Sequence, residues 1–442
     1  MVKVSTICRS ELEWTKDRNG EIPRAHRNYD PKQNPMARET EYVRAIRGAK
    51  LDRMFAKPFV GSLAGHQDTV LSLALDPCNV STLVSGSADG GLCIWDASMR
   101  RMKGFVQAHR HSVTGIAFTP DSVAFLSCSQ DKTVRLWDSE SVSETCSPVV
   151  EFLGHSSFTS IDHHRRKCHF VTTGNVVQIW DVNRTLPLHD FVWGDDSVTF
   201  ARFNRIETDL VACCMADRGV LVFDARAKAG HNKVIMELCC SSVCWSPMDP
   251  NVLVAGSDDW HCYLFDMRVP GRPKSVFQGH IHAVTSVDFC PTGKEFAAGS
   301  TDCTVRTWSL NQQTKSTSQE MFHTKRMAKI YCVAWSLDNT YIFSGSEDAN
   351  LRIWKADSSK PIRPLRGCEL NSFNYLRSLK DKYKLFPEVK RIVSQRNTPK
   401  AIRKVQLRRK KIQIRQAVKE MSLKKSDNLV PLAKRKVVQS LK

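Results

Sequence analysis

Residues 91–96 read GLCIWD, a short β-rich run that ends in a tryptophan followed by an aspartate. A run of this kind, closing on an aromatic residue, returns six more times along the chain. The seven endings are LCIWD at Trp95, VRLWD at Trp137, VQIWD at Trp180, VLVFD at Phe223, CYLFD at Phe265, VRTWS at Trp308 and LRIWK at Trp354. The successive aromatic residues lie 42, 43, 43, 42, 43 and 46 positions apart. Such a period indicates one supersecondary unit repeated seven times.

Two further elements recur at fixed places inside this period. A Gly-His pair, once Ala-His, begins four of the repeats: Gly65-His66, Ala108-His109, Gly154-His155 and Gly279-His280. Six repeats carry an aspartate six residues before the aromatic residue: Asp89, Asp131, Asp217, Asp259, Asp302 and Asp348. This pattern is typical of WD repeats, each of which folds into one four-stranded blade. We therefore predict an all-β fold, a seven-bladed WD40 β-propeller with an N-terminal arm and a basic α-helical C-terminal extension.

The repeats divide the chain into three consecutive regions. Residues 1–59 form the N-terminal arm, residues 60–359 the propeller, and residues 360–442 a basic helical C-terminal domain. In the arm, Asn-Tyr-Asp-Pro and Asn-Pro steps predict an extended loop, and a helix is expected from about residue 38 to residue 55.

An amphipathic helix is expected just after the propeller. Its apolar residues recur at spacings of three and four: Phe373, Leu376, Leu379, Tyr383 and Phe386. Pro387 and Pro399 separate it from the segments that follow. We expect this helix to dock on the propeller or on a neighbouring protein.

Histidine, serine, aspartate and tryptophan form matching sets in the first two repeats. These sets are His66, Ser85, Asp89 and Trp95, and His109, Ser127, Asp131 and Trp137. The aspartate can accept hydrogen bonds from turn amides and from the histidine, which reaches through the serine hydroxyl toward the indole N–H. A nucleophilic triad is the alternative interpretation. Because the set returns with the period of the fold, we interpret it as structural and expect no catalytic residue and no enzyme.

Two repeats depart from the pattern. The third has Gly174 in place of the turn aspartate, and the fifth has Cys239 and Cys240 where Gly-His would stand. Without these polar groups a blade loses part of the hydrogen bonding that fixes its turns. We expect these two blades to be the irregular ones.

Composition excludes several classes of protein. No window approaches the roughly 18 consecutive apolar residues of a membrane span, and the mean hydropathy is -0.34, so we expect no membrane partner.

The sixteen cysteines are scattered through strand-like runs without a CxxC motif or an export signal, which favours reduced thiols. The neighbouring His163 and His164 would point to opposite faces of a strand. We therefore expect no metal site and no cofactor.

The excess positive charge lies entirely in the C-terminal region. Residues 360–442 hold 25 Lys and Arg against 5 Asp and Glu, whereas the rest of the chain holds 40 of each sign. The densest cations are expected on one helix, and we predict that they bind RNA: Lys400, Arg403, Lys404, Arg408, Arg409, Lys410, Lys411, Arg415 and Lys419. A nuclear or nucleolar address, or a solvated tail, is the alternative, and the first of these can coexist with RNA binding.

Several segments outside the repeat pattern resemble the SOF family of WD-repeat proteins. They are RNYDP at 27–31, KLDRMFAKPF at 50–59, SIDHH at 160–164, PTGKEF at 291–296 and FHTKRM at 322–327. The stretches FNYLRSLKDKYKLFPEVKRI and TPKAI resemble the C-terminal domain of that family. The chain departs from the family where SQRNTPK and KKSDNLVP replace a His-rich basic stretch and a His-Ser-Lys-Pro-Gly segment.

The resemblance implies a function. SOF proteins are non-catalytic components of the small-subunit processome, which acts with a box C/D small nucleolar RNA on ribosomal RNA precursors. It implies a nucleolar scaffold for ribosomal RNA processing and small ribosomal subunit biogenesis. The partners expected from it are pre-ribosomal RNA, a small nucleolar ribonucleoprotein and processome proteins.

A second function rests on two short boxes at the ends of repeats four and five. Phe-Asp-Ala-Arg ending at Arg226 and Phe-Asp-Met-Arg ending at Arg268 resemble the paired boxes of WD-repeat substrate receptors in cullin-RING ubiquitin ligases. In such receptors the arginine of each box faces the ligase adaptor. The alternative interpretation is an ordinary arginine after a blade strand, which is common in propellers.

Overall fold

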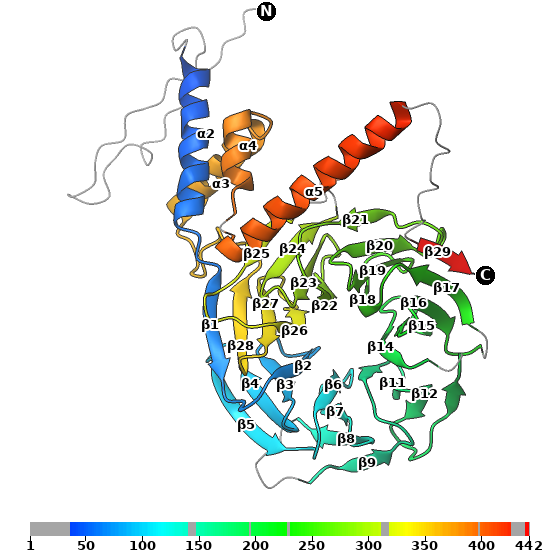
Figure 1. Ribbon diagram of the computed structural model, residues 1–442. Helices are drawn as coiled ribbons and strands as arrows, with labels where there is room; N and C mark the ends of the chain where they lie inside the picture. The colour runs from blue at the N-terminus through cyan, green and yellow to red at the C-terminus, as the bar shows by residue number, and fades with distance from the viewer. Residues whose placement is uncertain are drawn as a thin grey trace, which may run out of the picture. The chain divides into compact units, whose positions relative to one another are not determined.

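A computed structural model describes residues 36–139, 147–193, 196–227, 230–310, 318–396, 398–425 and 438–441. RNYDP at 27–31 and most of the N-terminal arm lie outside these residues. The WD repeats form seven antiparallel sheets, and Figure 1 shows them arranged as blades around a common axis. The predicted seven-bladed propeller is confirmed.

The first four blades follow the order of the chain. The first consists of β2 (Val70–Leu75), β3 (Thr82–Ser87), β4 (Gly91–Asp96) and β5 (Arg101–Gln107). The second consists of β6 (Val113–Phe118), β7 (Ala124–Ser129), β8 (Thr133–Asp138) and β9 (Val150–Leu153). The third consists of β10 (Ser160–His163), β11 (His169–Thr173), β12 (Val177–Asp181) and β13 (His189–Phe191). The fourth consists of β14 (Val198–Phe203), β15 (Leu210–Met215), β16 (Gly219–Asp224) and β17 (Gly230–Met236).

The last three blades complete the ring. The fifth consists of β18 (Cys240–Trp245), β19 (Val252–Ser257), β20 (Cys262–Asp266) and β21 (Ser275–Phe277). The sixth consists of β22 (Val284–Phe289), β23 (Glu295–Ser300), β24 (Val305–Ser309) and β25 (Glu320–Phe322). The seventh consists of β26 (Ile330–Trp335), β27 (Tyr341–Ser346), β28 (Asn350–Lys355) and β1 (Phe59–Ala64).

The N-terminal strand closes the ring. β1 precedes the first blade in sequence, yet it pairs antiparallel with β28 of the seventh, so that Leu63 lies opposite Leu351. Both leucines are buried in a cluster that also contains Trp95 of the first blade. Residues from the two ends of the repeat region therefore share one sheet and one core.

Burial between neighbouring blades explains the apolar pattern of the repeats. Each hydrophobic cluster of the propeller joins side chains of adjacent blades, as where Phe152 of the second blade packs with Phe170 and Trp180 of the third. Their rings meet edge to face at 5.2 and 6.0 Å between centroids. A blade alone would leave both faces in water, so its stability comes from its neighbours.

The two blades expected to be irregular behave differently. The third has shortened strands of four, five, five and three residues, and its His155 is exposed. The fifth keeps strands of six, six and five residues before a three-residue edge strand. The expectation was therefore wrong for the fifth blade. Cys240 does not stand at the Gly-His position but begins the inner strand, where the first blade has Val70. The histidine position, four residues earlier, holds Met236, which is buried in the core and needs no hydrogen-bond partner.

The helices belong to two compact units whose composition crosses the expected region boundaries. One unit contains α2 (Ala37–Met54), α3 (Gly367–Lys382) and α4 (Pro387–Ser394). The other contains the propeller with α5 (Lys400–Lys425) and β29 (Val438–Leu441), which pairs with β17 at the edge of the fourth blade.

The partner of the amphipathic helix is α2, from the other end of the chain. Leu379 and Tyr383 pack against Ala45 of α2 and Val389 of α4. Gly48 brings the backbone of α2 close to Leu376, since a Cβ there would lie 3.3 Å from its side chain. The two segments therefore bury part of their apolar faces against each other, while Val43, Leu51 and Phe386 stay exposed. Docking on the propeller or on a neighbouring protein remains a prediction.

The closure predicts a measurable cost for weakening the seam. Leu63→Ala should lower the free energy of unfolding by about 2 to 4 kcal/mol, because it opens a cavity beside Leu351 and Trp95. Leu153→Ala is the control, since that leucine lies on an edge strand and is 72% exposed. Chemical denaturation measures both. Equal stability of the two variants would contradict a closed seam at β1.

Candidate functional site

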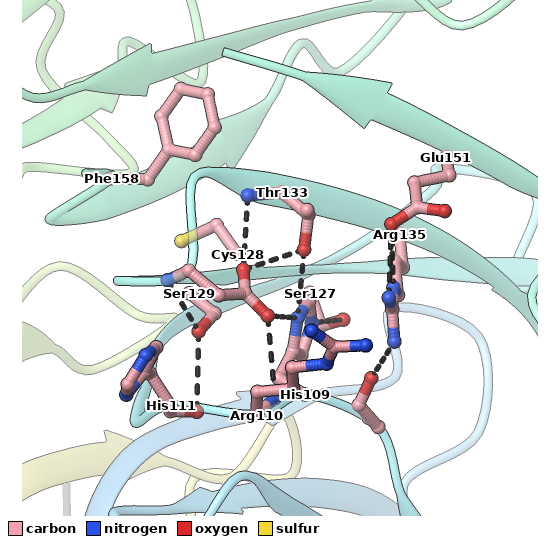
Figure 2. A network of polar contacts seen from close by, with 12 residues as sticks. His109, Arg110, His111, Ser127, Cys128, Ser129, Thr133, Arg135, Glu151 and Phe158 are labelled. Atoms are coloured by element: carbon pink, nitrogen blue, oxygen red, sulfur yellow. Dashed lines mark hydrogen bonds and ion pairs between the residues drawn. The ribbon is translucent and has the colours of Figure 1, made fainter. Parts of the chain in front are cut away.

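The second blade holds the complete polar set of histidine, serine, aspartate and tryptophan. His109 Nδ1 lies 3.0 Å from Asp131 Oδ2, and His109 Nε2 lies 2.8 Å from Ser127 Oγ. The indole N–H of Trp137 donates to the same serine oxygen at 2.9 Å. Figure 2 shows His109, Ser127 and Thr133 within this network. The chain of bonds ties a loop, a turn and two strands of one blade together.

The first blade has the same residues in a different arrangement. His66 Nε2 lies 2.6 Å from Ser85 Oγ, which also accepts the indole N–H of Trp95 at 2.7 Å. Asp89 accepts from the amide of Gly91 at 2.9 Å and does not reach His66. The aspartate here fixes its own turn, and Cys93 takes its place beside the histidine ring.

Burial and protonation set these residues apart from a nucleophilic triad. Ser85 and Ser127 have no exposed surface, so no substrate can reach either hydroxyl. Burial lowers the pKa of His66 to about 4, although the nearby Asp89 raises it. Burial also lowers the pKa of His109 and outweighs the attraction of Asp131. Both rings are therefore neutral parts of the core at pH 7.

The sixth blade shows what the serine contributes. His280 Nδ1 lies 3.0 Å from Asp302 Oδ2, but Ala298 stands where Ser85 and Ser127 stand in their blades. Within the described residues, His280 Nε2 and Trp308 Nε1 are buried without a hydrogen-bond partner. The sequence contained this signal, a Ser-to-Ala change at one fixed position of the repeat.

Most of the cations of α5 are exposed, but one of them, Arg409, is held against the propeller. Eight of the nine predicted RNA-binding residues are exposed, whereas Arg409 is half-buried. The Arg409 guanidinium lies 3.8 Å from the centre of the Trp260 ring and donates to the Ile281 carbonyl at 2.6 Å. Gln406 and the buried Ile402 lie on the same side of the helix, where Gln406 donates to the Gly279 carbonyl at 3.3 Å. This side anchors α5 to the fifth and sixth blades.

Five of the eight exposed cations form a stripe along α5, which we name the basic stripe. They recur at spacings of four, three, four and four residues, which places them on one side of a helix: Lys404, Arg408, Lys411, Arg415 and Lys419. A second exposed stripe is apolar: Leu407, Ile414, Val418 and Met421. The sequence predicted the basic helix, but Arg409 alone could not be assigned to the propeller, because its partner Trp260 is distant in sequence.

The two box arginines occupy equivalent places in adjacent blades. Arg226 forms an ion pair with Asp209 while 71% of its side chain stays exposed. Seventeen residues before Arg268, at the matching position, the side-chain amide of Asn251 faces that guanidinium. In the amide orientation that satisfies both groups, its oxygen accepts from the guanidinium at 2.9 and 3.2 Å. Each arginine therefore braces a neighbouring turn and still presents part of its surface to solvent.

Metal sites, disulfides and membrane-spanning helices are absent among the described residues. Within those ranges, no three His, Cys, Asp or Glu side chains come close enough to hold a metal ion. Every cysteine that the structure describes is a free thiol. No described helix is both long and apolar enough to cross a bilayer.

Comparison with known proteins agrees with this architecture. A family model described as a Sof1-like domain matches residues 356–438. The WD domain, G-beta repeat, matches residues 57–96, 101–138, 228–266, 271–309 and 318–355. The repeat matches leave out 139–227, which includes the shortened third blade.

Curated relatives cover most of the chain. DDB1- and CUL4-associated factor 13 of Xenopus tropicalis is 38% identical over 403 residues, 91% of this chain and 90% of its own length. The human protein of that name is 37% identical over 403 residues, with the same coverage of both chains. Protein SOF1 of Saccharomyces cerevisiae is 36% identical over 430 residues, 92% of this chain and 87% of its own.

Fold and comparisons together define a WD-repeat scaffold, and no catalytic family is indicated. The chain belongs to the SOF family of WD-repeat proteins. The resemblance read from the sequence is therefore confirmed.

The serine at the centre of the polar set should contribute measurably to the stability of the fold. Ser127→Ala should lower the free energy of unfolding by about 2 kcal/mol, because it leaves buried His109 and Trp137 nitrogens unpaired. The reciprocal change, Ala298→Ser, should raise it by about 1 kcal/mol by supplying the missing partner to His280 and Trp308. Urea denaturation measures both. A destabilised Ala298→Ser variant would contradict the shared role of this position.

Proposed function

We infer that this chain is a non-catalytic scaffold of the small-subunit processome, a small nucleolar ribonucleoprotein, in the nucleolus. There it supports ribosomal RNA processing and small ribosomal subunit biogenesis. Membership of the family that includes yeast Protein SOF1 supports this role. The observation that carries it is α5, a helix fastened to the propeller on one side and lined with exposed cations on another.

The basic stripe of α5 suits an RNA backbone. Exposed Lys and Arg side chains on a helix release counterions when they meet phosphates, without reading the sequence of the bases. The stacking of Arg409 on Trp260 holds the start of this helix in one orientation. The cations after it, from Lys410 to Lys419, then extend beyond the anchored turns.

Protein neighbours have a surface of their own on the same helix. Leu407, Ile414, Val418 and Met421 are each more than half exposed, and such a stripe is typical of a helix that meets a protein groove. We assign it to processome proteins. Separate stripes allow one helix to contact RNA and protein together.

Neutralising the basic stripe should weaken RNA binding and leave the fold intact. The variant carries Lys404→Gln, Arg408→Gln, Lys411→Gln, Arg415→Gln and Lys419→Gln. The slope of log Kobs against log salt should fall by about 3 to 4, since each phosphate contact on single-stranded RNA contributes about 0.7. Fluorescence anisotropy with a mixed-sequence RNA measures it.

A charge-preserving variant, with Lys and Arg exchanged at the same five positions, is the control and should bind as the parent does. If the stripe is only an address, the neutral variant will lose nucleolar accumulation while its RNA affinity stays unchanged. That result would contradict RNA binding by α5.

A ligase function is the second candidate. Relatives named DDB1- and CUL4-associated factor 13 support it, as do the exposed surfaces of Arg226 and Arg268. In this role the chain would be a substrate receptor of a cullin-RING ubiquitin ligase, and both arginines would face the adaptor. Both functions can coexist in one protein.

Substituting both box arginines tests the ligase candidate. Arg226→Ala with Arg268→Ala should reduce recovery of the DDB1 adaptor in a pull-down at least tenfold. Arg184→Ala, an exposed arginine in the corresponding turn of the third blade, is the control. Undiminished recovery with the double variant would remove this candidate.

A further inference from the structure

At one end of the propeller, the innermost strand of each blade turns into the second strand. The residue just after the inner strand accepts hydrogen bonds from amides of the turn in several blades. Asp76 Oδ1 accepts from Cys78 and Asn79 at 2.9 and 3.2 Å, and Asn204 Oδ1 accepts from the second and third amides after it at 2.9 and 3.3 Å. These turns are therefore built on one plan.

In the third blade a histidine performs this role. His164 Nδ1 accepts from the amides of Arg166 and Lys167 at 3.0 and 2.9 Å. Burial lowers the pKa of His164 to about 4, and the charge of Lys167 lowers it further. The ring is thus neutral and acts as a fixed acceptor, which explains the second histidine of the His-His pair without a metal.

The residue at the tip of these turns distinguishes two blades from the others. Four blades place proline directly after the acceptor position: Pro77, Pro120, Pro247 and Pro291. Proline suits this place because its fixed φ matches the first turn residue. The seventh blade has Leu337 at this place, and blades three and four have Arg165 and Arg205. Turn formation does not require arginine there, so its presence points to a contact outside the blade.

The two arginine-bearing turns lie side by side. Arg165 Nη1 donates to the Arg205 carbonyl at 3.1 Å. Arg165, Arg166, Lys167 and Arg205 are all exposed. The turn of the fourth blade also carries two carboxylates, the exposed Glu207 and the half-buried Asp209. In the part of the chain that the structure describes, no ion pair joins a carboxylate to Arg165, Arg166 or Arg205.

Asp209 binds the next cations into the same surface. It accepts from Lys167 Nζ at 2.6 Å and forms an ion pair with Arg226 of the fourth blade. One carboxylate therefore orients two cations, and it neutralises only one of their two positive charges. The surface as a whole has Arg165, Arg166, Lys167, Arg205 and Arg226 on two adjacent blades, and we name it the blade 3–4 patch.

We propose that the blade 3–4 patch binds the phosphodiester backbone of RNA. Arginine offers donors in a fork that matches phosphate oxygens. Ile206, 38% exposed, is the large apolar side chain exposed on these tips, whereas a protein interface needs an apolar centre. The surface therefore favours a polyanion of regular spacing over an acidic protein segment.

The patch is distinct from the basic stripe of α5. Successive antiparallel strands reverse direction, so the turns from inner to second strand lie at one end of the propeller. Trp260, between β19 and β20, and Gly279, between β21 and β22, lie at the other end, where α5 is anchored. The inference goes beyond the proposed function, since it gives the propeller an RNA contact of its own.

The test uses the full chain with Arg165→Gln, Arg166→Gln and Arg205→Gln, in the parent and in the variant with a neutralised α5 stripe. Fluorescence anisotropy with a mixed-sequence single-stranded RNA gives affinity at several salt concentrations. In both backgrounds the triple variant should bind about tenfold more weakly at low salt, and its salt slope should fall by about 2. If the triple variant loses RNA affinity in the parent background but not in the background with the neutralised α5 stripe, the patch is not a separate RNA-binding site and the proposal is overturned.

Two controls separate charge from folding and from the ligase surface. Arg165→Lys with Arg166→Lys and Arg205→Lys should keep most of the affinity, and thermal unfolding should match for all variants. Arg268→Ala, at the place equivalent to Arg226 but in the fifth blade, should leave RNA binding unchanged. Unchanged RNA affinity of the triple Gln variant, with lost binding of a poly-glutamate peptide, would show a protein ligand and overturn the proposal.

Discussion

The pairing of β1 with β28 is the contact on which the remaining structure depends. Every blade buries its apolar faces only against its neighbours, so a ring with one open junction would expose two faces at once. This exposure is avoided because β1, which precedes the first blade in sequence, is the fourth strand of the seventh blade, with Leu63 opposite Leu351. Closure then fixes all seven sets of turns in space, including those that carry the box arginines and the blade 3–4 patch.

Much of this fold is readable from the sequence because its signals are local and repeated. The aromatic endings and the turn aspartates recur with one period, and each reports a strand and a tight turn. Contacts between distant segments are harder to foresee. Neither the apolar face of α2 nor that of α3 specifies that they pack together. The sequence around Arg409 likewise does not indicate that its partner is Trp260.

Within the candidate sites, residue type was readable and geometry was not. The set around Ser127 forms as its spacing suggested, whereas Asp89 binds its own turn and leaves His66 to Ser85. His164 has no motif that marks it as a turn acceptor, because its role depends on where the hairpin places its Nδ1 atom. Such positions become clear only when equivalent residues of all the blades are compared in three dimensions.

A closed ring with cations at both ends suits a protein that holds RNA and proteins together in one particle. Sedimentation of the protein from nuclear extract, with and without ribonuclease, tests this central claim most directly. We expect it in a large particle that ribonuclease disperses. A sedimentation profile that ribonuclease leaves unchanged, with the protein in a complex of ligase size, would contradict the account.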